Sequence, residues 1–472
     1  MRLVLFMSQF KQFISPWYLG YAFQGAAVLG LAPILLPLVV GTALGNSAAG
    51  IVVACFYVGQ LASPLLGNFA DRTRAFRLIY ASGYVLLAAG LTGFAVVESL
   101  LFWALLAFVQ GLGSAATNTV AAMFIVEFSP KKQWDGKIGW LQTFYGAGQA
   151  AGLGLAAIAQ AHPTLGLLFS AALMAPGLFL GLRGLPQSGD DKSTPHKPFR
   201  ERTRELQARA ARLISTGPRN LSHMVHHYHP GTTGLVSGLV KSLRTPYGLY
   251  ILAWFACMFG TWLLYNLYPL LMQSAFDVKA DRSSMFYAVA AVIGVFFYAP
   301  SGKLGKKIGD VAVVTVGTVV TLICLVIMSA LAWWQPANAG WWAALAFVPI
   351  PVAWSPLIVA GTAAAAQLSS LNEGKAVGIF NATTAIASVL SAFAAGWVAD
   401  LLSYTWVLIL AAIASGIAFV LLLPLLKQNK PVDGDDDQAT EDDGASTAPQ
   451  TAEKSAAPDA SSTEGHGSPN RG

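Results

Sequence analysis

The stretch GNFADRTRAFR, residues 67–77, interrupts an otherwise apolar part of the chain with three arginines and one aspartate. An apolar run of about 20 residues, enough to cross a membrane as a helix, lies on either side of it. We therefore expect a tight charged loop between two membrane helices. A second charged stretch, GKLGKKIG, begins at residue 302, which is 235 positions later (302 minus 67) and about half the chain length. This spacing predicts a duplicated set of helices.

The composition of the whole chain is that of a helical membrane protein. Of its 472 residues, 55% are hydrophobic and 11% are charged, whereas soluble domains carry roughly 25% charged residues. Twelve continuous apolar stretches lie six on each side of a central hydrophilic segment. They predict an all-α polytopic fold of twelve transmembrane helices, arranged as two pseudo-symmetric six-helix bundles.

Charge and hydropathy divide the chain into five regions. We expect an N-terminal interfacial segment, two six-helix bundles, a basic cytoplasmic linker with amphipathic helices between them and a disordered acidic tail. In chain order these are residues 1–15 (interfacial segment), 16–184 (first bundle), 185–244 (linker), 245–427 (second bundle) and 428–472 (tail). Ten acidic and two basic residues from position 431 onward give the tail a charge of −8, so the remainder carries +14.

Lysine and arginine predict the orientation. With the N-terminus inside, 27 of the 29 basic residues fall in segments facing the cytoplasm, and the two exceptions are Lys279 and Arg282. Cytoplasmic loops of membrane proteins carry such an excess. We therefore expect a multi-pass protein of the inner (cytoplasmic) cell membrane with both termini in the cytoplasm.

The sequence offers no pattern typical of a metal site or of an enzyme. Four histidines lie between His223 and His229, without the cysteines or carboxylates of a structural metal site. Cys55, Cys257 and Cys324 lie inside apolar runs and suit packing. A phosphate-binding loop ending in Lys-Ser or Lys-Thr is absent. We expect no metal, no cofactor and no enzymatic activity.

The charged stretches resemble a known pair of motifs. GNFADR, residues 67–72, resembles the loop 2–3 signature of the major facilitator superfamily, Gly-x-Leu-Ala-Asp-Arg/Lys-x-Gly-Arg-Arg, and GKLGKKIG resembles its degenerate counterpart in loop 8–9. The chain departs from the signature at Arg74, where the family has glycine, and at Lys306, which replaces the aspartate of the second copy. The resemblance covers residues 16 to about 427 and implies a transporter whose two halves rock around a central site.

The resemblance also implies a gate. In such proteins the glycine of the first motif lets two helices approach closely, and the aspartate faces the start of the eleventh span. Helix N-termini attract carboxylates by about 0.3–1 kcal/mol. The expected gating residues are Gly67, Asp71, Arg72 and Glu373.

Polar residues recur at equivalent positions of the two halves. Three in the fifth span match three in the eleventh at an offset of 239 (381 minus 142), and each set is spaced i, i+3, i+7 on one helical face. Further polar residues lie in the first, fourth and seventh spans. We expect a cavity on the pseudo-symmetry axis, although amides also join neighbouring membrane helices. The predicted lining residues are Gln24, Gln110, Asn118, Gln142, Tyr145, Gln149, Tyr265, Asn266, Asn381, Thr384 and Ser388.

The middle of every predicted span is free of ionisable residues. A charge inside a membrane costs about 2.5–3.5 kcal/mol and is kept where ions or protons must be handled. The sequence therefore predicts a small neutral or amphiphilic organic substrate.

We expect a monomeric secondary active or facilitative transporter that contacts lipid and a small-molecule substrate but no nucleic acid. Export is favoured because the glycine-rich residues 146–154 are similar to the fifth-span motif of drug–proton antiporters, although that motif's proline is missing. Uptake of a nutrient such as a sugar or nucleoside is the alternative. A membrane sensor with a transporter fold is a third possibility, of another class.

Overall fold

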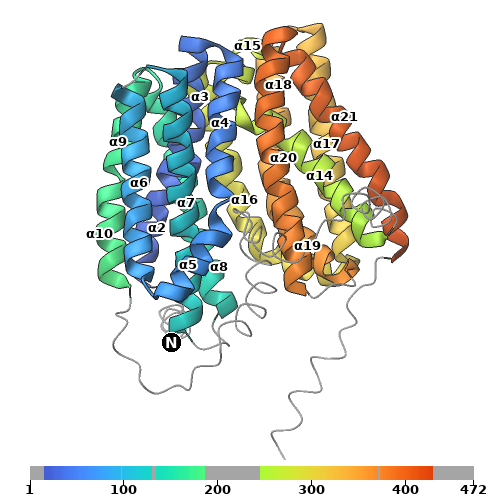
Figure 1. Cartoon of the computed structure of the whole chain (residues 1–472). Helices are drawn as coiled ribbons and strands as arrows, with labels where there is room; N and C mark the ends of the chain where they lie inside the picture. Colours follow the sequence, from blue (N-terminus) through green and yellow to red (C-terminus); the bar gives the residue numbers. More distant parts are fainter. Residues whose placement is uncertain (1–14, 97, 130–133, 186–244, 370–372, 429–472) are drawn as a thin grey trace, which may run out of the picture. The chain divides into compact units, whose positions relative to one another are not determined.

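The structure is a computed structural model that describes residues 15–96, 98–129, 134–185, 245–369 and 373–428. Figure 1 shows these residues as long helices lying side by side. Within the described ranges the chain forms helices and no strands, which confirms the predicted all-α fold.

The helices fall into two sets of six spans, of which several are broken. The first half contains α2 (Tyr18–Gly25), η1 (Ala26–Leu31), α3 (Ala32–Leu44), α4 (Asn46–Gln60), α5 (Ser63–Thr73), α6 (Phe76–Val96), α7 (Leu100–Phe128), α8 (Trp134–Ala159), α9 (Pro163–Ala172) and α10 (Met174–Gly184). The second half contains α14 (Pro246–Asn266), α15 (Tyr268–Phe276), α16 (Ala280–Ile308), α17 (Asp310–Trp334), α18 (Ala339–Phe347), α19 (Pro349–Leu368), α20 (Glu373–Leu401), α21 (Tyr404–Leu422) and η3 (Leu423–Gln428).

Eleven of the described spans are long and apolar enough to cross a membrane. Helix α8, with 26 residues, is long enough but is not among them. It corresponds to the fifth of the twelve predicted spans, and its glutamines and glycines lower its hydropathy. Gln142 and Gln149 of α8 line the cavity described below, so the polarity of this helix has a structural reason.

Prolines explain the breaks in the first, seventh and tenth spans. Proline cannot donate a backbone hydrogen bond to the preceding turn, and that turn then widens or ends. Pro33 follows the π-helical segment η1, Pro269 follows the break at Leu267 between α14 and α15, and Pro349 follows the break at Val348 between α18 and α19. All three broken spans contribute side chains to the cavity.

The predicted loop at residues 67–77 is shorter than expected. Helix α5 continues to Thr73 and α6 begins at Phe76, so two residues separate them. Arg74, the first of these, ends α5 in the left-handed conformation with φ of 55°, which explains why the family pattern has glycine there. The second stretch, residues 302–309, is likewise the end of α16 rather than a loop. A prediction from hydropathy places the end of a span at its first charged residues, whereas the helix itself can continue beyond the membrane into water.

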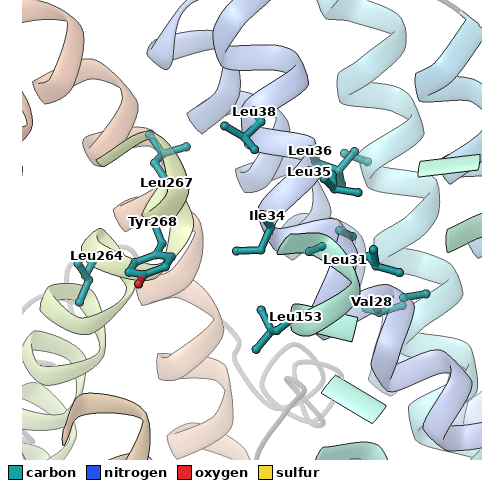
Figure 2. Close-up of a cluster of buried hydrophobic side chains, with 14 of the residues drawn as sticks. Val28, Leu31, Ile34, Leu35, Leu36, Leu38, Leu153, Leu264, Leu267 and Tyr268 are labelled. Atoms are coloured by element: carbon teal, nitrogen blue, oxygen red, sulfur yellow. The ribbon is translucent and has the colours of Figure 1, made fainter. Parts of the chain in front are cut away.

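The two halves pack against each other mainly through three helix pairs, α4 with α20, α8 with α16 and α3 with α15. One apolar cluster contains residues from both sides. Figure 2 shows Ile34 and Leu38 of α3 in this cluster together with Leu264 of α14 and Tyr268 of α15. The first and seventh spans are thus held together by buried apolar contacts.

The backbones of α4 and α20 come closest near Asp400, at the end of the bundle that also contains α15 (upper part of Figure 1). A Cβ atom placed on Gly50 would lie 2.4 Å from the carbonyl oxygen of Ala392, and one on Gly396 would lie 2.5 Å from that of Asn46. Two side chains larger than hydrogen cannot occupy these positions. We call this end of the molecule the Asp400 end.

Candidate functional site

A cavity of about 220 Å³ lies between the two halves. Its wall is built from η1, α3, α4, α7 and α8 of the first half and from α14, α15, α16, α19 and α20 of the second. Ligand sites in proteins measure about 300–1,000 Å³, so this cavity is smaller than most and has room for only a small molecule in this conformation.

Nine of the eleven predicted lining residues lie on this wall. They include all six members of the repeated stripes of α8 and α20, which are placed there as the repeat predicts. The nine are Gln110, Gln142, Tyr145, Gln149, Tyr265, Asn266, Asn381, Thr384 and Ser388. Their contact with a substrate stays a prediction.

Gln24 and Asn118, contrary to the prediction, are not among the residues that line the cavity. The hydroxyl of Tyr21 and the amide nitrogen of Gln24 each donate to Asn118 Oδ1 at 2.9 Å. The Asn118 amide donates in turn to Ser114 Oγ at 3.3 Å, and so does Gln60 Nε2. These bonds join α2, α4 and α7 in a buried network. Helical spacing identified the polar face correctly, but neighbouring side chains cover this part of it.

Two glutamines of the first half present unused amides. Gln110 is 2% exposed, and its Nε2 has no hydrogen-bond partner among the described residues. Gln142 Nε2 is also buried and has no hydrogen-bond partner among the described residues. An unpaired buried donor costs about 1–3 kcal/mol, so these two amides are polar groups that the closed packing leaves without a bond.

An aromatic part of the wall centres on Trp262 of α14. Its ring centroid lies 5.4 Å from that of Tyr57, 5.9 Å from that of Tyr265 and 5.9 Å from that of Trp354. Tyr57 belongs to α4, so this contact joins the two halves. The indole Nε1 of Trp262 is buried and also lacks a partner among the described residues.

The cavity is uncharged. None of the described residues that line it is an aspartate, glutamate, lysine, arginine or histidine. A charged solute that left water for this wall would find no counter-ion to offset its desolvation. The lining offers amides, hydroxyl groups and aromatic rings instead.

Asp400 of α20 holds the Asp400 end closed. Its carboxylate accepts the backbone N–H groups of Asn46 at 3.2 Å and Ser47 at 2.6 Å, and the Asn46 side-chain amide at 2.8 Å. The Tyr404 hydroxyl donates to Asn46 Oδ1 at 2.6 Å. A carboxylate from the second half thus caps the N-terminus of α4 in the first, an arrangement that the helix dipole favours.

The sequence matches the profile of the Major Facilitator Superfamily over residues 17–369 and 352–458. The chain belongs to this superfamily. It is therefore a multi-pass membrane transporter of small molecules and not an enzyme. None of the curated proteins compared by sequence matches the chain.

Solved structures of other superfamily transporters share the fold. A variant of the nucleoside transporter NupG superimposes with a TM-score of 0.65 at 13% identity, over 88% of this chain and 99% of that one. A POT family transporter in complex with 5-aminolevulinic acid gives 0.63 at 15% identity, over 89% and 96%. A bacterial homologue of the human lysosomal transporter Spinster, inward-facing and unoccupied, gives 0.59 at 12% identity, over 88% and 97%. Identities this low establish the fold and do not bear on the resemblance to drug exporters.

The predicted gate of this transporter lies partly outside the described residues. Gly67 is in α5, and a Cβ atom placed on it would lie 3.3 Å from Thr119 Cγ2 of α7, so the glycine permits close packing. Asp71, Arg72 and Glu373 belong to helices, but their side chains are among those the structure does not describe. Their role as a gate stays a prediction.

Sequence reasoning missed five lining residues with hydroxyl or amide groups, Tyr57, Gln60, Tyr268, Tyr287 and Ser355. Tyr57 and Gln60 are three positions apart on α4, so they share one helical face. They were missed because the prediction looked for polar residues that recur at the half-chain offset, and these two have no such counterpart. A search for polar pairs in apolar runs would have found them.

Proposed function

We propose that this transporter carries a small uncharged organic compound through the cavity by alternating access. The observation that supports the proposal is the uncharged wall: both halves contribute amides and aromatic rings, and no described lining residue is an aspartate, glutamate, lysine, arginine or histidine that could neutralise an ion. A compound with its own charge would lose hydration without gaining a partner, whereas an uncharged one would gain both polar and apolar contacts.

The contacts at the Asp400 end support one conformation of such a cycle, the one in which this end is closed. There Asp400, Gly50 and Gly396 hold α4 against α20, while α5, at the far end of the second span, packs mainly on α6 and α7 of its own half. With the basic residues placed in the cytoplasm, the Asp400 end faces outward and the cavity exchanges with the inside in this conformation.

Export is the direction we propose, and the glycine-rich residues 146–154 of α8 support it through their similarity to drug–proton antiporters. Uptake is the second candidate, since one structure with this fold is a nucleoside transporter.

The proposal is tested with purified protein in liposomes. We first expect uncharged compounds to raise the unfolding temperature, and then expect the best of them to equilibrate across the bilayer at the same rate with and without a pH gradient. Accumulation against a gradient that needs the pH difference would contradict the proposal. Initial rates of entry into everted and right-side-out membrane vesicles, compared with the same compound, then test the preferred direction: faster entry into everted vesicles supports export, and faster entry into right-side-out vesicles supports uptake.

A further inference from the structure

The exposed tryptophans gather at one end of one half of the molecule. Among the described side chains there are six, each between 43% and 77% exposed. They lie in the last turn of α17, the first turn of α18, the end of α20 and the start of α21, all at the Asp400 end, where Figure 1 shows α18 in its upper part. The six are Trp333, Trp334, Trp341, Trp342, Trp397 and Trp406.

The first half has no counterpart at this end. Of its four tryptophans only Trp103 of α7 lies there, and it is 1% exposed. The turns between α3 and α4 and between α8 and α9 contain neither tryptophan nor tyrosine. Phe102 of α7 is exposed, but a phenylalanine ring carries no polar atom. Exposed aromatic rings with a polar atom therefore lie at this end of the second half only, as far as the structure describes the chain.

Contacts between helices make these tryptophans part of one rigid surface. The ring centroid of Trp333 in α17 lies 6.1 Å from that of Trp406 in α21, and that of Trp341 in α18 lies 5.5 Å from that of Phe286 in α16. Between α17 and α18, the amide of Gln335 donates to the backbone of α15 at 2.7 Å. The turn that carries four of the six tryptophans is thus fixed to the neighbouring spans.

The chemistry of this surface fits the headgroup layer of a bilayer. An indole places its apolar ring among lipid chains while its N–H bonds to headgroup oxygens, so tryptophan is enriched at membrane interfaces. The basic residues of this end, Lys279 and Arg282, are exposed beside Asp277 and Asp281, so the local charges balance. A nearly neutral surface rich in tryptophan suits zwitterionic phospholipids and offers little attraction to a charged partner.

We infer that this surface anchors the second half to the headgroup layer, and that the first half has no such anchor at the Asp400 end. The anchor adjoins the contact that closes this end, because Trp397 precedes Asp400 by three positions and Trp406 follows Tyr404 by two. Asp400 is therefore held at a fixed level in the membrane, and Asn46 of the first half moves to it when this end closes. The inference does not depend on which compound is transported.

Spin labels beside the two partners of the closing contact test the inference in the full-length protein. Leu402→Cys in the second half and Leu44→Cys in the first are exposed positions, and each carries a single label in a cysteine-free background. Label depth is measured in phosphatidylcholine bilayers with hydrocarbon cores of about 27 Å and about 33 Å. In the thicker bilayer we expect the Leu402 label to keep its depth within about 1 Å, and the Leu44 label to lie about 3 Å deeper, which is half of the added thickness.

Variants assign the anchor to the tryptophans. Leucine keeps an apolar side chain but lacks the ring and the N–H, so a fourfold variant should release the Leu402 label, which then lies about 2 Å or more deeper in the thicker bilayer. A milder variant, with leucine at positions 334 and 342 only, should give a smaller shift in the same direction. The matched control is Phe296→Leu, which removes an exposed ring from the middle of α16 and should leave the depth unchanged. The fourfold variant combines Trp333→Leu, Trp334→Leu, Trp341→Leu and Trp342→Leu.

Four results would overturn the inference. If the Leu402 label deepens as much as the Leu44 label in the otherwise unchanged protein, the second half is not anchored; if neither label moves, the anchor is not confined to one half. If both tryptophan variants keep the Leu402 label in place, or Phe296→Leu releases it, the tryptophans are not the anchor. A second copy of this chain is the competing occupant of the surface: dipolar coupling between labels on Trp342→Cys of two copies, with exclusion of oxygen dissolved in the lipid, would show that protein covers it.

Discussion

Replacing Gly50 with valine is expected to abolish most transport by preventing closure at the Asp400 end. The Cβ atom of any larger residue would lie 2.4 Å from the carbonyl oxygen of Ala392, a backbone atom that cannot rotate away. Overpacking of this kind costs about 1–3 kcal/mol, and the upper end corresponds to a shift of about a hundredfold in the ratio of closed to open molecules. Transport should fall at least tenfold in liposomes, because every cycle must pass through the closed conformation.

The conformational cause is measured with spin labels. After Cys55, Cys257 and Cys324 are replaced by serine or alanine, labels on Leu44→Cys and Leu402→Cys report one exposed position in each half, at 48% and 62% exposure. Gly50→Val should lengthen the distance between the labels.

The matched control is Gly154→Val in α8, because a Cβ atom there would meet no atom within 4 Å. This variant should transport normally and keep the wild-type distance. Normal transport by Gly50→Val with an unchanged distance would show that close contact of α4 and α20 is not part of the cycle.

Replacing Gln110 with glutamate is expected to make transport strongly dependent on pH. Burial disfavours an ionised carboxylate, so the introduced group should keep its proton well above the pH at which an exposed glutamate, near 4.3, loses it. At pH 5 the protonated acid resembles the amide in size, and transport should stay within about threefold of wild type. At pH 8 the ionised form would carry the membrane penalty of about 2.5–3.5 kcal/mol, so transport should fall by about a hundredfold.

Two comparisons make this result interpretable. Wild-type transport should be nearly flat between pH 5 and pH 8, because none of the described lining residues is acidic, basic or a histidine. Gln110→Leu removes the amide without adding an ionisable group, so its transport should be slower than that of the wild type but equally independent of pH. A steep pH profile in the wild-type protein, or a flat profile in Gln110→Glu, would show that ionisation matters elsewhere in the cycle.

The repeated polar stripes carried the most structural information in the sequence. Gln142 and Asn381 are 239 positions apart and belong to helices that do not share a hairpin, yet both line one cavity. This was predictable because duplicated halves place equivalent helical faces on a common axis. The family pattern was also informative at position 74. It has glycine where α5 of this chain ends at Arg74 with a positive φ, a conformation that glycine adopts most easily.

The sequence could not show which neighbour covers a polar face. Asn118 has the same helical spacing as residues that line the cavity, but Tyr21 and Gln24 bond to it and it lies behind the wall. The contact between Asp400 and Asn46 was equally hidden, because the two residues are 354 positions apart in the sequence. Helical periodicity gives the face of a side chain, whereas the partner depends on how distant spans pack.

The central claim is that an uncharged cavity accepts uncharged solutes. Its most direct test is competition for transport by three matched forms of the transported compound, which differ only in carrying an amide, a carboxylate or an amine at one position. We predict that the amide form competes and that both charged forms fail at tenfold higher concentration. Competition by a charged form at the same concentration as the amide, with loss of that competition in Gln110→Leu, would contradict the account.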